Sequence, residues 1–176
     1  MKTFFPFCFL TILLLLAFVL QDAVPSIGFL GQVPLILVPT IFCFAALALT
    51  FPLALFFSLI TAIISGLMII EFPNDSPEIG LSWFVFFFMA WFIALQFLND
   101  LTEGVRWEVH AIGSALCTTT LLFAEFLLLS LKRGHFSITE RAMVLIITPG
   151  VISLFIAPLF YGFLQIFLLP ATPAKR

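Results

Sequence analysis

Residues 34–70 form an uninterrupted stretch without a charged side chain, and this stretch limits the possible folds more than any other. As one helix it would measure roughly 55 Å, nearly twice the ~30 Å hydrocarbon core of a bilayer. Pro52 suits the first position of a new helix after Thr50, because proline lacks the amide hydrogen that the first helical turn leaves unused. We therefore predict a tight helical hairpin with its turn near Thr50.

The chain as a whole is strongly apolar. Of the 176 residues, 63% are hydrophobic and 9% are charged, and the mean hydropathy is +1.28. Seven Lys and Arg with nine Asp and Glu are too few to cover a soluble domain of this size. The composition predicts an all-α polytopic membrane protein, a single bundle of about six transmembrane helices in one domain over residues 1–176. The expected helices cover residues 4–20, 34–49, 51–70, 82–98, 109–131 and 141–169.

The charged residues between and beyond these segments suggest an orientation in the membrane. Lys2 precedes the first helix and Asp22 follows it, which favours a cytoplasmic amino terminus; six spans then return the carboxyl terminus to the same side. Ser137 and Glu140 have capping-box spacing and predict a cap at the start of the sixth helix. The net charge of −2 and the lack of a basic cluster argue against nucleic acid as a partner.

The third segment carries small residues at every fourth position, namely Ala54, Ser58, Ala62 and Gly66. This spacing places them near one helix face, and small residues allow two helix backbones to approach closely in a membrane. We call this set the small-residue stripe. Its partner is either a neighbouring helix of the same chain or a helix of a second protein.

Glu125 lies within the apolar stretch TLLFAEFLLLSL, about 9 Å of helix from Leu131. An ionised carboxylate at that depth is costly, so we expect Glu125 to make an internal polar contact. The structural interpretation is a hydrogen bond to Gln96, Gln165 or a hydroxyl on an adjacent helix. The functional alternative is a proton or substrate site.

No catalytic arrangement is apparent in the sequence. His110 and Glu125 are separated by roughly 22 Å along one helix, which is too far for direct contact, and no nucleophile, metal-binding or phosphate-binding motif is present. Cys8, Cys43 and Cys117 lie in apolar segments without a C-x-x-C motif and are interpreted as packing residues. We therefore expect a protein without enzyme activity, cofactor or metal.

Four segments of the chain stand out together: LTFPLALFFSLITAIISGLM, IGLSWFVFFFMAWFIALQFL, the polar loop NDLTEGVRWEVHAIGSAL and the helix LLFAEFLLLSL. They resemble the MreD family of bacterial rod shape-determining membrane proteins, and Glu125 would match an acidic position of that family. The sequence departs from the family after Gly66, where an acidic residue is delayed to Glu71 and NDSPE is inserted.

The resemblance implies a non-enzymatic scaffold in the bacterial inner membrane. Such a subunit would hold a bitopic MreC-like partner in the cell-elongation machinery that synthesises peptidoglycan and sets cell shape. The same six-helix plan looks like the substrate-binding subunit of energy-coupling-factor vitamin transporters, which remains the alternative. The segments DAVPSIGFLGQ and EFPNDSPEIG are poor in the polar side chains that would build a small-molecule pocket, so the scaffold is favoured.

Overall fold

The computed structural model describes residues 4–23, 33–68, 77–101, 107–134 and 139–168. Six helices lie within these ranges, which confirms the predicted all-α class. They are α1 (Phe4–Ala23), α2 (Val38–Ala48), α3 (Phe51–Met68), α4 (Pro77–Leu101), α5 (Trp107–Arg133) and α6 (Glu140–Leu168). All except α2 are long and apolar enough to cross a membrane, which is the character of a multi-pass membrane protein.

The predicted hairpin between the second and third segments is present. Helix α2 ends at Ala48, and α3 starts at Phe51 with Pro52 in its first turn. The predicted second helix was too long, because residues 33–37 precede α2 without helical structure. The position of Pro39 gives the reason: proline has no amide hydrogen for the carbonyl four residues earlier, so it fits the first turn of a helix but not its interior.

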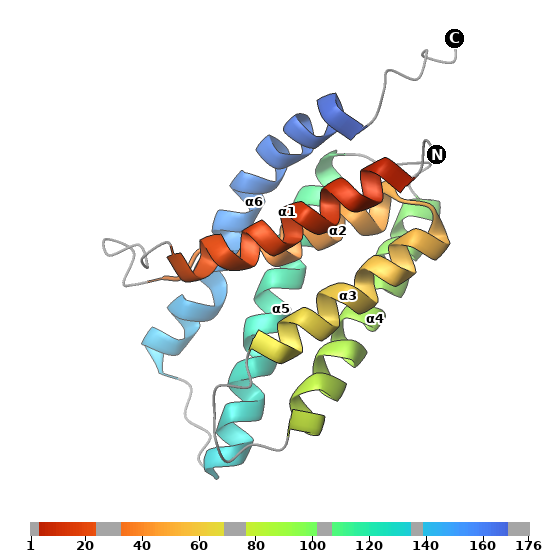
Figure 1. Ribbon diagram of the computed structural model, residues 1–176. Coiled ribbons are helices and arrows are strands. Elements are labelled where there is room, and N and C mark those ends of the chain that lie inside the picture. Colours follow the sequence, from red (N-terminus) through yellow and green to blue (C-terminus); the bar gives the residue numbers. More distant parts are fainter. Residues whose placement is uncertain (1–3, 24–32, 69–76, 102–106, 135–138, 169–176) are drawn as a thin grey trace.

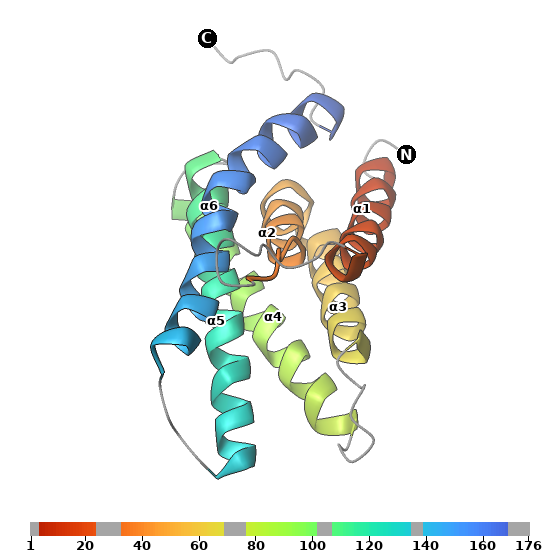
Figure 2. The ribbon, with the colours of Figure 1, turned by 90° about the vertical axis from the view of Figure 1, so that its left-hand side faces the viewer.

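Helix α2 is the centre of the molecule. It contacts each of the other five helices, and every residue from Val38 to Leu47 is buried. Figure 2 looks along α2 and shows the other helices arranged around it. Its 11 residues extend roughly 16 Å, about half the thickness of a hydrocarbon core, so α2 is too short to span the core.

Successive helices run in alternating directions (Figure 1). As a result, the start of α1 and the end of α6 lie at the same end of the molecule in both views. Helix α6 contains Pro149 and Pro158 but remains helical from Glu140 to Leu168. Its axis changes direction along its length (Figure 2), and proline inside a helix is a usual cause of such a bend because it removes a backbone hydrogen bond.

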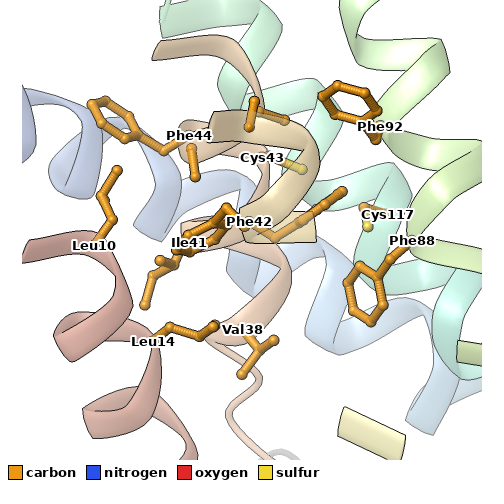
Figure 3. Close-up of a cluster of buried hydrophobic side chains, with 14 of the residues drawn as sticks. Leu10, Leu14, Val38, Ile41, Phe42, Cys43, Phe44, Phe88, Phe92 and Cys117 are labelled. Atoms are coloured by element: carbon orange, nitrogen blue, oxygen red, sulfur yellow. The ribbon is translucent and has the colours of Figure 1, made fainter. Parts of the chain in front are cut away.

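The apolar core is built on α2 (Figure 3). Leu10 and Leu14 of α1 approach it from one side, while Phe88 and Phe92 of α4 approach it from the other. The rings of Phe42 and Phe88 meet edge to face with centroids 4.9 Å apart. Such aromatic pairs supply close packing, which drives helix association where lipid removes the hydrophobic advantage of burial.

Candidate functional site

Five buried polar side chains meet where α2, α5 and α6 come together, and we call this cluster the polar junction. Helix α2 contributes Thr40, α6 contributes Ser153, and α5 contributes His110, Ser114 and Thr118. The three α5 residues follow one another at intervals of four, which places them on one face of that helix. Each of the five is at most 2% exposed.

Hydroxyl groups connect the three helices of the junction. The hydroxyls of Thr40 and Ser153 are 3.0 Å apart and share a hydrogen bond between α2 and α6. The Thr118 hydroxyl donates to the carbonyl of Ser114 at 2.8 Å and also lies 3.5 Å from Ser153 Oγ. The shorter of these two contacts is the stronger hydrogen bond, so the Thr118 hydrogen belongs mainly to its own helix.

His110 supplies the imidazole of the polar junction and is fully buried. Its Nε2 lies 3.0 Å from the backbone oxygen of Thr40, and because a carbonyl can only accept, Nε2 carries a hydrogen. The imidazole packs against the rings of Phe44 and Tyr161, with centroids 5.7 and 5.8 Å away. Two buried atoms of the junction, Nδ1 of His110 and Oγ of Ser114, have no hydrogen-bond partner in the described part of the chain.

Two glutamines satisfy the ends of α2. Gln21 of α1 accepts hydrogen bonds through Oε1 from the amides of Leu37 and Val38, at 3.1 and 3.0 Å. Gln96 of α4 donates from Nε2 to the carbonyl of Ala46 at 2.6 Å. A helix leaves unpaired amides at its start and unpaired carbonyls at its end, and inside an apolar bundle these groups need protein partners.

The predicted hydrogen bond from Glu125 to Gln96, Gln165 or a hydroxyl on an adjacent helix is not formed among the described residues. Gln96 bonds to α2, Gln165 is exposed on α6, and no hydrogen bond joins either one to Glu125 in the described structure. Glu125 is half-buried and lies seven residues after Thr118, so it continues the inward face of α5 that bears the polar junction. Sequence reasoning identified Gln96 as a polar contact but assigned it the wrong partner.

The small-residue stripe faces the inside of the chain. Its four residues, Ala54, Ser58, Ala62 and Gly66, are all buried. Helix α3 packs against α4, α2 and α1, and the Ser58 hydroxyl donates to the carbonyl of Ala54 at 2.8 Å. Of the two alternatives left open by the sequence, the structure therefore supports packing within the chain.

The predicted cap of the sixth helix involves different residues. Ser137 lies outside the described residues, and α6 begins at Glu140, so the residue before the helix is Thr139. The Thr139 hydroxyl accepts a hydrogen bond from the amide of Ala142 at 3.2 Å. Thr139 thus takes the capping role predicted for Ser137, since a cap must directly precede its helix.

Helix α5 approaches α6 closely at Gly150. A Cβ at Gly150 would overlap the hydroxyl of Thr119 and lie 3.0 Å from the backbone oxygen of Ala115. On another side, α5 is joined to α4 by a hydrogen bond from Trp91 Nε1 to Thr120 Oγ1, at 3.0 Å. Both contacts fix the position of the helix that carries most of the polar junction.

The three cysteines occupy two regions of the bundle. Cys43 and Cys117 are buried neighbours across the contact between α2 and α5, where Figure 3 shows both thiols, while Cys8 is half-buried on α1. Among the described residues, no three His, Cys, Asp or Glu side chains cluster as metal ligands would. When compared with known proteins, the chain matches no family model, no curated protein and no solved structure.

Proposed function

We propose that this chain is a non-enzymatic scaffold subunit of the bacterial inner membrane that holds a bitopic, MreC-like partner in the cell-elongation machinery. One observation supports the proposal: interior polar side chains from three surrounding helices bond to the backbone of α2. Gln21 accepts hydrogen bonds from the amides at the start of α2. Gln96 donates to a carbonyl in its last turn, and His110 donates to the carbonyl of Thr40. These side chains therefore hold α2 in place against its neighbouring helices.

A body fixed in this way suits the task of a scaffold. Binding a partner helix costs less free energy when the receiving surface is already ordered. All the long helices, α1, α3, α4, α5 and α6, present large exposed apolar side chains, which in a membrane contact either lipid or the apolar helix of another protein. The small-residue stripe is already used inside the chain, so the partner surface proposed here lies on these outer faces.

Both termini are proposed to face the cytoplasm. The shared position of the α1 start and the α6 end supports a common side, and Lys2 favours the cytoplasm for it. Reporter fusions at Arg176 and at Asp75 are expected on opposite sides of the membrane. Reporters on the same side contradict this orientation.

Affinity purification from native membranes tests the function. The tagged chain is expected to retain a protein with one transmembrane helix, and depletion of the chain is expected to make rod-shaped cells round. The alternative, a vitamin-transporter subunit, replaces the scaffold if the washed protein retains a vitamin-sized molecule and no such partner.

A matched pair of variants tests whether the small-residue stripe packs inside the chain. Ala62→Leu enlarges a buried position of α3, while Ile63→Leu changes the adjacent exposed position. Ala62→Leu is expected to lower the melting temperature of the purified chain without any partner, because added volume in a packed interface costs about 1 to 3 kcal/mol. Ile63→Leu is expected to leave it unchanged; equal effects of the two variants would refute the internal placement of the stripe.

A further inference from the structure

We propose that the polar junction binds an ordered water molecule between His110 and Ser114. The site lies inside the bundle, three residues after the start of α5, and is independent of the proposed scaffold function. Nδ1 of His110 and Oγ of Ser114 are both fully buried and lack a partner among the described residues. Buried polar atoms are normally hydrogen-bonded, by protein groups or by ordered water.

The helical spacing of the two residues suits one bridging molecule. Residues four apart on a helix have Cβ atoms about 5 to 6 Å apart on the same face. One water oxygen with two hydrogen bonds of about 2.8 Å can bridge groups separated on this scale, whereas one direct hydrogen bond requires about 3 Å. His110 and Ser114 therefore carry their two unsatisfied groups on the same face of α5.

The positions of the hydrogens on His110 and its neighbours determine which hydrogen bonds the water molecule must donate. Because Nε2 of His110 donates to the carbonyl of Thr40, Nδ1 of the neutral ring is an acceptor and needs a donor. The carbonyl of Ala157, which lies close to the imidazole, can only accept. The Thr118 hydroxyl already donates to the carbonyl of Ser114. A water molecule that donates to Nδ1 while accepting from Ser114 satisfies both unpaired groups, and its second hydrogen can go to the carbonyl of Ala157.

The Ser114 hydroxyl also differs from other hydroxyls on these helices. Those of Ser58, Thr118 and Thr119 each donate to the carbonyl four residues earlier, which is the usual bond for a hydroxyl in a membrane helix. Ser114 does not bond to the corresponding carbonyl of His110. Its hydroxyl is thereby left to a partner outside its own helix.

The polar junction lies close to the start of α5. The first turn of α5 contains Trp107 and Glu108, both exposed, and the half-buried ring of Tyr161 packs against His110. His110 is roughly 4.5 Å along the helix from Trp107. A bound water here is therefore expected to exchange with the solvent during a spectroscopic measurement.

Solid-state NMR on the full chain in lipid bilayers tests the proposal. The sequence has two histidines, so His135→Gln leaves His110 as the sole imidazole, and labelling with ¹⁵N-histidine reports on its two nitrogens. We expect Nε2 to be protonated, Nδ1 to be unprotonated but hydrogen-bonded, and magnetisation to pass from water protons to Nδ1. Ser114→Ala is expected to weaken this transfer several-fold, while the control Ser58→Ala leaves it unchanged.

The spectrum without further substitution decides the outcome if Ser114→Ala does not fold. A protonated Nδ1 would overturn the proposal, because it would donate directly to the carbonyl of Ala157. A hydrogen-bonded Nδ1 without transfer from water would also overturn it and would assign the donor to Ser114 itself. Unchanged transfer in folded Ser114→Ala protein would place the water away from Ser114 and refute the assigned site.

Discussion

Gly150 is the position at which one added methyl group is expected to damage the bundle most clearly. In Gly150→Ala the new Cβ would overlap the Thr119 hydroxyl and lie 3.0 Å from the backbone oxygen of Ala115. The Thr119 side chain can rotate away, since its own hydrogen bond is local. The oxygen of Ala115 belongs to the α5 backbone, so α5 and α6 must separate to relieve that contact.

The expected loss follows from two opposing effects. Overpacking a tight contact costs about 1 to 3 kcal/mol, while replacing glycine by alanine in a helix returns up to about 1 kcal/mol. A net destabilisation of about 1 to 2 kcal/mol lowers the melting temperature of a chain of this size by about 2 to 8 °C. Gly162→Ala is the matched control on the same helix, because its Cβ would have no neighbouring atom within 4 Å.

Tryptophan fluorescence during heating, in detergent micelles and in nanodiscs, measures both variants. Gly162→Ala is expected to keep or raise the melting temperature, and Gly150→Ala to lower it. The double variant Gly150→Ala with Thr119→Ala is expected to recover only part of the loss, because the contact with Ala115 remains. Equal melting temperatures for the two glycine variants, or full recovery in the double variant, would refute the argument that backbone proximity limits this interface.

Three further predictions concern polar and sulfur groups. Gln96→Leu is expected to destabilise the chain by about 1 to 3 kcal/mol in thermal melts because it leaves a carbonyl of α2 unpaired, whereas Gln165→Leu on the exposed surface is expected to have little effect; equal effects contradict the capping role. Cys43 and Cys117 are fully buried where α2 meets α5, so both thiols are expected to resist a water-soluble thiol reagent in the folded chain; rapid labelling of either one, detected by mass spectrometry, would contradict this burial. Glu125→Gln is expected to retain stability and function, because glutamine keeps hydrogen-bonding capacity and loses a charge that is costly in a membrane; loss of function at normal protein abundance would instead indicate proton chemistry.

The helix positions could be predicted because they depend on local properties of the chain. Apolar length, proline placement and charged turns define where each segment starts and stops, and the turn near Thr50 was found from length and Pro52 alone. The error at the second helix has the same local origin. Residues 34–49 carry no charge, and hydropathy does not distinguish a helix from an apolar segment without helical structure.

The polar junction could not be predicted, because its members are distant in sequence. Thr40 and Ser153 lie on the second and last helices, and their contact depends on how the bundle closes. One signal was visible: His110, Ser114 and Thr118 repeat at the interval that aligns side chains on one helix face. From the sequence, Glu125 was the side chain considered as a partner of His110. The observed partner is a backbone carbonyl of α2, and every residue has such a carbonyl, so the sequence could not identify it.

The length of α2 explains why polar residues gather inside so apolar a chain. A spanning helix exposes its unpaired terminal groups to water, whereas an 11-residue helix within the bundle must pair them with protein, and each unpaired group costs several kcal/mol. Gln21 and Gln96 supply those partners. A loss of function after either is replaced is therefore expected to result from misfolding of the chain. Glu125 is different, because no end of α2 requires it. Substitution of Glu125 is therefore the most direct way to distinguish a structural subunit from a subunit that moves protons.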